Sequence, residues 1–222
     1  VELPSDEDLG ITETTAQNLT GYRNIAIFGV DSRSDDYGVG NRSDCIIIAS
    51  INNDTGAIKL ISVYRDTYVK IEGHGLDKIT HAYSFGEAPL AIKTLNTNLD
   101  LNINEFVTVN FDSVAEAVDQ LGGVQLTITS DEIKYINGYI DETSRVTGKT
   151  SSHITQPGTY TVDGVQAVSY SRIRYTDGGD YKRTERMRTV IEAMFSKLKT
   201  KSITEINSFA DKILPHVYTN IS

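Results

Sequence analysis

Three short runs rich in β-branched residues follow one another early in the chain. They are residues 24–30 (NIAIFGV), 44–51 (DCIIIASI) and 57–63 (AIKLISV). Runs of this length and composition are typical of strands, and the turn sequence NDTG between the last two predicts a β-hairpin. Because helical patterns follow these strands, the chain is expected to form an α/β layered domain with some antiparallel pairing.

Helices are predicted where apolar residues recur every three or four positions. Such stripes occur over residues 89–99, 183–200 and 203–217. Capping residues predict two more helices: Asp112 or Ser113 begins one that ends at Leu121, and Asp163 begins one over residues 164–171. Alternating segments predict strands at 105–110 and 124–129, whereas residues 130–160 give only weak signals.

Composition limits the class of protein. The chain has 222 residues, 39% of them hydrophobic, which suits either one compact α/β domain or a domain plus a small appendage. Its formal charge of −9 argues against nucleic acid as the main partner. The single cysteine, Cys45, allows no internal disulfide, and the longest apolar run, residues 45–49, is far below the roughly 20 residues of a membrane span.

Residues 1–20 carry five acidic residues and no lysine or arginine. This composition predicts a polar stem or an early surface helix and not a part of the core. The chain does not begin with Met, so the lack of a signal peptide or membrane anchor in it does not exclude either from the natural protein.

Positive charge is concentrated in one segment. Five of the ten arginines fall within residues 172–188, whose formal charge is +3 while the rest of the chain carries −12. A cationic segment on an acidic protein favours a compact anion such as phosphate, although a solvated helix face has the same composition. Two geometric arguments favour the anion: Arg183 and Arg186 would oppose the dipole at the start of a helix at 183, and Arg172 and Arg174 would point the same way in an extended backbone.

Charged residues also stand at the ends of the predicted strands. Asp31 follows the first strand, Arg42 and Asp44 open the second, and Arg65 follows the third. Carboxylate oxygens hold Mg²⁺ and arginine neutralises phosphate oxygens, so this set suits a metal–pyrophosphate site. Each pair taken alone also reads as a surface salt bridge. Charged residues at three strand ends, together with the cationic segment, favour the site.

Five motifs in this order and spacing resemble the LytR-CpsA-Psr family over about residues 22–200: GVDSR (29–33), NRSD (41–44), VYRDT (63–67), DKITHAY (77–83) and SRIRYTDGGDYKRTERMR (171–188). The resemblance implies an α/β/α sandwich, with a central mixed β-sheet flanked by helices and a hydrophobic pocket for a lipid tail. It implies a bacterial, Mg²⁺- or Mn²⁺-dependent phosphotransferase. Such an enzyme moves teichoic acid, capsule or a similar glycopolymer from a polyprenyl-pyrophosphate carrier to peptidoglycan, with pyrophosphatase activity if water attacks instead.

The resemblance also implies roles for single residues. Asp31 and Asp44 match the metal-binding carboxylates. The arginines expected to hold the pyrophosphate are Arg42, Arg65, Arg172, Arg174, Arg183 and Arg186. Asp180 matches a catalytic position, although it reads equally well as the N-cap of the following helix. His81 lies in a motif but is a lone histidine, and Met187 stands where relatives often carry Gln.

The resemblance further implies a catalytic domain over residues 21–222 on the outer face of the cytoplasmic membrane. Relatives usually continue past residues 219–220, which leaves open a domain cut short at Ser222. An N-terminal helix outside this chain would anchor it. We expect Asp31, Asp44, Arg42, Arg65, Arg172 and Arg174 to converge at one mouth, with an apolar pocket opening there. Two alternatives stay open: a transcription regulator, although no basic recognition helix is visible, and a non-catalytic lipid- or cell-wall-binding protein.

Overall fold

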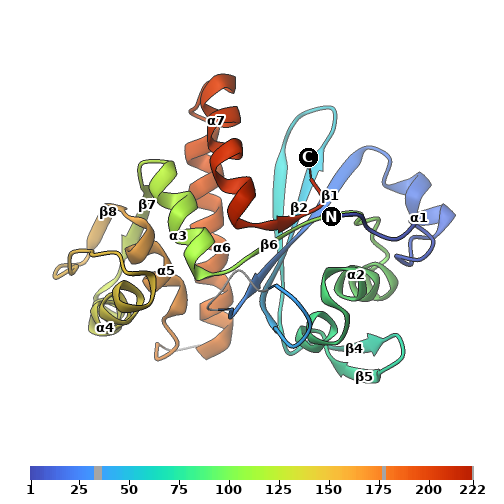
Figure 1. Cartoon of the computed structure of the whole chain (residues 1–222), viewed down its shortest axis with the longest axis horizontal. Helices are drawn as coiled ribbons and strands as arrows, with labels where there is room; N and C mark the ends of the chain where they lie inside the picture. The colour runs from blue at the N-terminus through green and yellow to red at the C-terminus, as the bar shows by residue number, and fades with distance from the viewer. Residues whose placement is uncertain (33–36, 177–178, 222) are drawn as a thin grey trace. The chain divides into compact units, whose positions relative to one another are not determined.

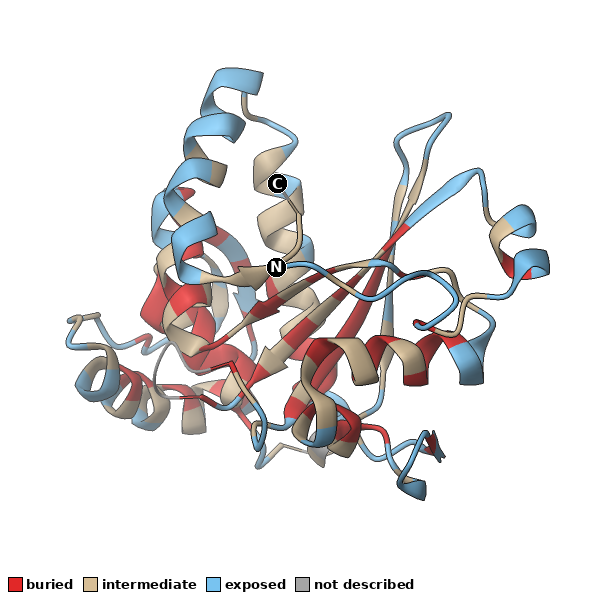
Figure 2. Ribbon diagram, turned by 45° about the vertical axis from the view of Figure 1, so that its right-hand side comes forward, coloured by how far each residue is buried: buried red, intermediate tan, exposed pale blue. Residues whose placement is uncertain are grey.

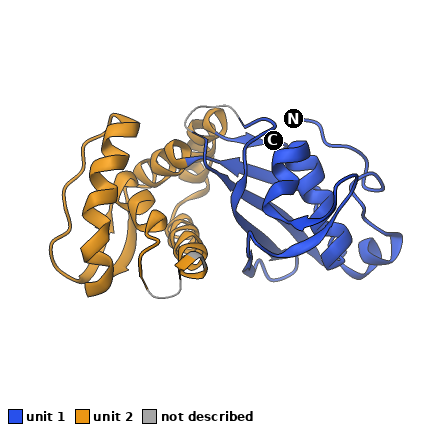
Figure 3. Cartoon of the chain, turned by 90° about the horizontal axis from the view of Figure 1, so that it is seen from below, with its two compact units in different colours: residues 1–110, 217–222 blue, residues 111–216 orange. Residues whose placement is uncertain are grey.

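The computed structural model describes residues 1–32, 37–176 and 179–221, and only the backbone of Asp180. The chain divides into two compact units, coloured separately in Figure 3. Unit 1 consists of residues 1–110 and 217–222, and unit 2 of residues 111–216. Because the chain leaves unit 1 at residue 110 and returns at 217, the domain predicted for residues 21–222 is built from two compact parts.

A five-stranded sheet forms the centre of unit 1 (Figure 1). Its order is β3-β2-β1-β6-β9. The strands are β1 (Tyr22–Val30), β2 (Ser43–Asn52), β3 (Ile58–Val63), β6 (Glu105–Val109) and β9 (Tyr218–Thr219). β1 pairs antiparallel with β2 and parallel with β6, so the sheet is mixed. The predicted hairpin is confirmed as β2 and β3.

Helix α2 (Thr80–Leu99) covers one face of this sheet (Figure 2). Alternate residues of β1 are buried, and Ala26 and Phe28 pack with Ile92 and Leu95 of the helix in one hydrophobic core. The period of two in the strand and the apolar stripe of the helix therefore meet, as expected for an α/β layer.

α2 begins nine residues before the predicted start at Pro89. Its backbone leaves helical geometry at Gly86 and Glu87, where φ is −154° and 55°. Pro89 stands just after this kink, where a first-turn proline loses no hydrogen bond. The sequence pattern therefore identified the second half of the helix, and the glycine and proline concealed the first half, from Thr80 to Phe85.

The other elements of unit 1 are the short helix α1 (Glu13–Asn18) and a hairpin of β4 (Tyr68–Ile71) and β5 (Gly75–Lys78). The polar stem predicted for residues 1–20 is wrong in part. Leu9 is 1% exposed and belongs to the core, where its carbonyl accepts a hydrogen bond from Asn96. The acidic composition described the surface of this segment and did not predict the packing of Leu9, Leu3 and Ile11 against the core.

Unit 2 packs helices around a two-stranded sheet. Its elements are α3 (Phe111–Gln120), β7 (Val124–Ile128), α4 (Ser130–Thr147), β8 (Gly158–Val162), α5 (Gly164–Arg172), α6 (Gly179–Leu198), α7 (Ile203–Ile213) and a 3₁₀ turn, η1 (Leu214–His216). β7 and β8 pair antiparallel, and apolar side chains from α3, α4, α5 and α6 close the core over them.

α4 is the longest element that the sequence did not predict. The Thr129 hydroxyl oxygen accepts a hydrogen bond from the backbone N–H of Glu132. The Glu132 carboxylate accepts one from the backbone N–H of Thr129, which completes a capping box. The Thr-x-x-Glu spacing at 129–132 was the available signal. Polar residues between the buried Ile136 and Ile140 weakened the apolar stripe.

Among three further helices, the predicted start is confirmed for α5 and differs for α3 and α6. Asp163 caps α5 as predicted, through the Gln166 amide. α3 begins at Phe111, so Asp112 and Ser113 lie inside its first turn and do not cap it. α6 begins at Gly179, four residues before the predicted start at 183.

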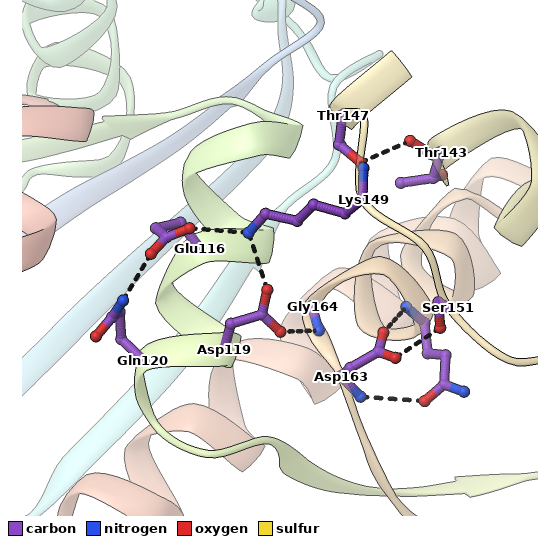
Figure 4. Close-up of polar contacts among 10 residues, drawn as sticks. Glu116, Asp119, Gln120, Thr143, Thr147, Lys149, Ser151, Asp163 and Gly164 are labelled. Carbon is purple, nitrogen blue, oxygen red and sulfur yellow. Dashed lines mark hydrogen bonds and ion pairs between the residues drawn. The ribbon is translucent and has the colours of Figure 1, made fainter. Parts of the chain in front are cut away.

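Helices α3 and α5 approach closely at Gly164, the first residue of α5. A Cβ atom there would lie 2.0 Å from the carbonyl oxygen of Ala115. Polar contacts surround this crossing (Figure 4): Asp119 accepts the Gly164 amide at 2.7 Å, and Lys149 bonds Glu116 and Asp119 at 2.8 and 2.9 Å. Only glycine allows this approach.

A buried ion pair joins α6 to α4. Arg186 Nε donates to Glu132 Oε1 at 2.8 Å, and both side chains are less than a tenth exposed. The other guanidinium nitrogens of Arg186 donate to the Ile173 carbonyl and to Thr176 Oγ1. The charge is therefore neutralised and hydrogen-bonded inside unit 2, as buried charges must be.

Within the described part of the chain, none of the helices has both the length and the apolar character needed to cross a bilayer.

Gly164→Ala is predicted to destabilise the protein by about 1–3 kcal/mol, because the new methyl group meets a backbone carbonyl that cannot move freely. Gly138→Ala is the matched control. Gly138 lies inside α4, and a Cβ there meets nothing within 4 Å, so alanine should gain up to about 1 kcal/mol of helix stability. Urea unfolding measures both; equal effects would contradict the close crossing.

Arg186→Met is predicted to cost about 3–5 kcal/mol, because it leaves the buried Glu132 carboxylate without a cation. Arg188→Met is the control on the same helix. Arg188 pairs with Glu192 at 3.4 Å on the surface, and its loss should cost about 0–1 kcal/mol. A melting temperature for Arg186→Met close to that of Arg188→Met would show that the buried pair contributes little.

Candidate functional site

The candidate site in unit 1 lies where β1 ends and β2 begins. Gly29 pairs with Cys45 and Val30 with Ser43, so Asp44 is an extra residue, a β-bulge, in β2. A bulge bends a strand and redirects the side chain that it carries. The bulge sets Asp44 at the same edge of the sheet as Asp31, which directly follows β1.

Arg65 contacts Asp44 directly. It lies two residues beyond β3, and its Nη1 donates to Asp44 Oδ1 at 2.5 Å, with the two side chains 19% and 14% exposed. Charge-assisted bonds of this kind are among the strongest in proteins and fix geometry as well as charge. Two of the sequence-predicted site residues are therefore brought into contact by the fold.

Two polar atoms beside this pair are buried without a partner. They are Arg65 Nε and Ser43 Oγ, the hydroxyl of the residue before Asp44. Most buried donors in proteins are hydrogen-bonded, and an orphan marks a place that strain, water, an ion or a ligand accounts for. Both orphans occur at the pair formed by Arg65 and Asp44, which favours an anionic or metal-bound ligand there.

Asp31 and Arg42 complete the unit 1 group. Both side chains are exposed, at the end of β1 and just before β2. Asp44 Oδ1, by contrast, accepts from Arg65. The group therefore offers one constrained carboxylate and one that faces solvent.

The oxygen donors fit a hard divalent cation. Asp31, Asp44 and the Ser43 hydroxyl supply oxygens at one edge of the sheet. Among the residues that the structure describes, no three His, Cys, Asp or Glu side chains form a cluster that could hold a metal. Mg²⁺ usually takes only one or two carboxylates and fills its remaining positions with water and substrate phosphate, so two carboxylates suffice.

Arg172 is held firmly in unit 2. Its guanidinium lies 5.0 Å from the Phe111 ring centre and 5.4 Å from that of Tyr139. It donates to Thr143 Oγ1 at 3.1 Å and to Glu142 Oε1 at 2.9 Å. Cation–π contacts and two hydrogen bonds fix the plane of the group, which keeps further N–H donors beyond those two bonds.

Tyr139 of α4 contacts this arginine, and two more tyrosines pair with each other, a feature that the sequence did not predict. The Tyr135 and Tyr175 rings are 5.8 Å apart, and Tyr175 is 71% exposed. Burial raises the pKa of Tyr139, with Tyr175 raising it further and Arg174 and Arg172 opposing the change. Tyrosines 135 and 139 lie four apart on α4, so a correct helix assignment for residues 130–147 would have revealed the pair.

Of the remaining predicted residues of unit 2, Arg174 is exposed, whereas Arg183 and Arg186 are buried. Arg186 uses three of its nitrogens on internal partners, a structural contact that the charge argument did not foresee. Arg183 is 3% exposed. The side chain of Asp180 lies outside the described residues.

The backbone of the cationic segment differs from both geometries expected for it. Because α6 begins at Gly179, Arg183 and Arg186 lie beyond its first turn, where the helix dipole acts weakly. Arg172 is the last residue of α5, so the backbone there is not extended. Arg172 is half-buried and Arg174 exposed, which means that the two side chains do not share one environment.

His81 has a partner in the structure. Its Nδ1 lies 2.9 Å from Asp77 Oδ2, and its ring is 5.9 Å from that of Phe85. The predicted site residues thus form one group in unit 1 and another in unit 2. Their convergence at one mouth stays a prediction.

Relatives of known function match most of the chain. It is 34% identical over 205 residues to the polyisoprenyl-teichoic acid–peptidoglycan teichoic acid transferase TagU of Enterococcus faecalis, covering 89% of this chain and 61% of that protein. It is 33% identical over 190 residues to the transferase TagT of Bacillus subtilis, covering 84% and 55%. The chain therefore spans about three fifths of the length of these relatives.

Solved structures share the fold. TagT bound to LIIa-WTA superimposes with a TM-score of 0.72 at 29% identity, covering 92% of this chain and 71% of that one. A second TagT structure, with bound octaprenyl pyrophosphate lipid, has a TM-score of 0.63 at 29% identity, covering 87% and 73%. The model of the LytR_cpsA_psr family matches residues 5–222. With a match of that extent, the chain belongs to the LytR-CpsA-Psr family.

Proposed function

We propose that this protein transfers a glycopolymer, teichoic acid in the first instance, from a polyprenyl-pyrophosphate carrier to peptidoglycan. The observation that carries the proposal is the contact between Arg65 and Asp44, with the buried orphan atoms Arg65 Nε and Ser43 Oγ beside it. Relatives at 34% and 33% identity are named as transferases of this kind, and a relative of the same fold holds octaprenyl pyrophosphate.

The reaction breaks a phosphoanhydride bond of the pyrophosphate and forms a phosphate ester bond. A sugar hydroxyl oxygen of the acceptor forms a bond to the phosphorus on the glycan side. The bond from that phosphorus to the bridging oxygen breaks, polyprenyl phosphate leaves with the electron pair, and the hydroxyl loses its proton. Positioning and neutralisation of charge are the main contributions that a protein makes to such a transfer.

Arginines supply that neutralisation in the proposal. Arg65, held in place by Asp44, donates to the pyrophosphate oxygens as negative charge develops on them. Arg172, fixed by Thr143 and Glu142, and the exposed Arg174 bind the same class of anion. Arg42 adds an exposed guanidinium. Arg183 and Arg186 contribute through the fold of unit 2, since both are buried.

Asp31 and Asp44 would hold the metal ion, Mg²⁺ or Mn²⁺. When bound, such an ion neutralises pyrophosphate oxygens that would otherwise repel the attacking hydroxyl. Asp44 has a second task, since the same carboxylate orients Arg65. A site of this composition also admits water as the attacking group, which would give pyrophosphatase activity.

An apolar surface for the lipid tail is available on the sheet of unit 1. Ile25 and Ile27 are partly exposed on the side of β1 that faces away from α2, because they alternate with the core residues Ala26 and Phe28. Burial of apolar surface is worth about 25 cal/mol per Å², so a polyprenyl chain gains several kcal/mol from such a surface. We propose this side of the sheet as part of the lipid site.

The proposed reaction places the protein at the wall side of the bacterial cytoplasmic membrane, where lipid-linked polymer and peptidoglycan meet. A membrane anchor preceding this chain belongs to the same proposal, and so does capsule polymer as an alternative donor. Mass spectrometry of lipids that copurify with the protein tests the ligand class. Polyprenyl phosphate or pyrophosphate supports the proposal, and a protein that yields neither and fails to bind added octaprenyl pyrophosphate contradicts it.

Arg65→Ala is predicted to lower transfer from a synthetic lipid-pyrophosphate donor about 10²–10³-fold, because a charge clamp on the transferring phosphoryl group is lost. Arg23→Ala is the control. Arg23 also pairs with a carboxylate in unit 1, Glu105 at 2.5 Å, but on the surface of the sheet. It should keep wild-type rates. If Arg65→Ala turns over normally, or fails only because it has melted at the assay temperature, the clamp role is wrong.

Asp44→Asn is predicted to respond to metal concentration, unlike Arg65→Ala. The substitution weakens the cation site but keeps an oxygen facing Arg65, so raised Mg²⁺ should restore part of the rate by mass action. Rates of both variants are measured from about micromolar to tens of millimolar Mg²⁺, a range in which carboxylate sites fill. A defect in Asp44→Asn that does not change over this range would remove Asp44 from the metal site.

A further inference from the structure

The first turn of α2 contacts both segments that carry the Arg65–Asp44 pair: the loop after β3 and the start of β2. Thr80, the first residue of the helix, donates its backbone N–H to the Arg65 carbonyl at 3.1 Å. Its hydroxyl donates to the Ser43 carbonyl, also at 3.1 Å. One buried residue therefore binds the backbone of the loop after β3 and the backbone next to the bulge that carries Asp44.

The need for these contacts follows from the helix itself. The first N–H groups of a helix have no partner within it and must find acceptors elsewhere. Ile79 donates to the Thr67 carbonyl at 2.9 Å and Thr80 to that of Arg65, so the loop satisfies the helix start and the helix start fixes the loop. Lys78 adds an ion pair to Asp66 at 2.7 Å.

The hydroxyl of Thr80 makes a hydrogen bond that the start of the helix does not require. It adds a donor to the Ser43 carbonyl at the bulge, where the regular strand pairing is interrupted. Thr80 is 0% exposed, and Ser43 is 0% exposed as well, so no solvent replaces this bond. Without the hydroxyl, the Ser43 carbonyl would lose this buried donor, and the bulge would lose a contact beside Asp44.

We propose that Thr80 is a positioning residue for the candidate site: its N–H and its hydroxyl together hold the Arg65 loop and the Asp44 bulge so that the two side chains meet. Thr80 is fully buried and cannot touch substrate, so it acts through Arg65 and Asp44. The effect on turnover rests on the proposed function, whereas the effect on geometry does not.

Thr80→Val tests the hydroxyl, since valine has nearly the same shape and keeps the backbone N–H. We expect kcat for transfer to fall at least tenfold with KM for the lipid donor changed less than threefold. Thr80→Ser restores the hydroxyl and should return kcat to within threefold of wild type. Thr94→Val is the matched control, because Thr94 is a buried threonine of α2 whose hydroxyl bonds the Leu90 carbonyl inside the helix.

Melting temperatures separate positioning from stability. Thr80→Val and Thr94→Val should melt within a few degrees of each other, while only Thr80→Val loses kcat. Equal losses of kcat in the two variants, a normal kcat in Thr80→Val, or failure of Thr80→Ser to recover would each overturn the proposal.

Crystal structures of the variants supply a readout that does not depend on transfer. The distance from Arg65 Nη1 to Asp44 Oδ1 should stay below 3.2 Å in Thr80→Ser and exceed 4 Å in Thr80→Val. An unchanged distance in Thr80→Val contradicts positioning. A wild-type protein that lacks transferase activity but shows the lengthened contact in Thr80→Val refutes the proposed function and leaves the positioning role standing.

Discussion

The candidate site depends on the unpaired N–H groups at the start of α2. A helix cannot satisfy them internally, and in unit 1 they are satisfied by carbonyls of the loop that carries Arg65. The same six residues before the kink, Thr80 to Phe85, also reach the loop between β1 and β2. Tyr83 donates to the Tyr37 carbonyl, and the Ser84 carbonyl accepts from Gly40. One short helical segment thus contacts two loops and the bulge of β2 at one end of the sheet.

Charge in unit 2 is used in two different ways. Arg186 is buried against Glu132 and its nitrogens bond protein groups, so it supports the fold. Arg172 is fixed between two aromatic rings and keeps donors for another partner. Both belong to one cationic segment of the sequence, and only their surroundings separate them. A count of arginines therefore finds the region of interest, whereas burial and hydrogen bonding decide which of them can meet a ligand.

Sequence reasoning succeeded where local chemistry is decisive. The hairpin of β2 and β3 follows from a four-residue turn between β-branched runs, and the cap at Asp163 follows from a side chain that bonds a nearby amide. It failed where local signals conflict. Gly86 and Pro89 conceal the first half of α2, and polar residues obscure α4 despite its capping box. Leu9 shows the same limit, because one apolar residue in an acidic segment does not reveal that it is buried.

The sequence by itself determined the family, the mixed α/β class and the identities of Asp31, Asp44, Arg65 and Arg172 as candidate site residues, because motifs and alternation are properties of the chain. Only the tertiary structure decided which of these meet. The bulge at Asp44 arises from pairing with β1, and the contact with Arg65 arises from a loop held by Thr80. The burial of Arg186 likewise depends on α4, more than fifty residues earlier in the chain. Such contacts join segments distant in sequence, so no local pattern encodes them.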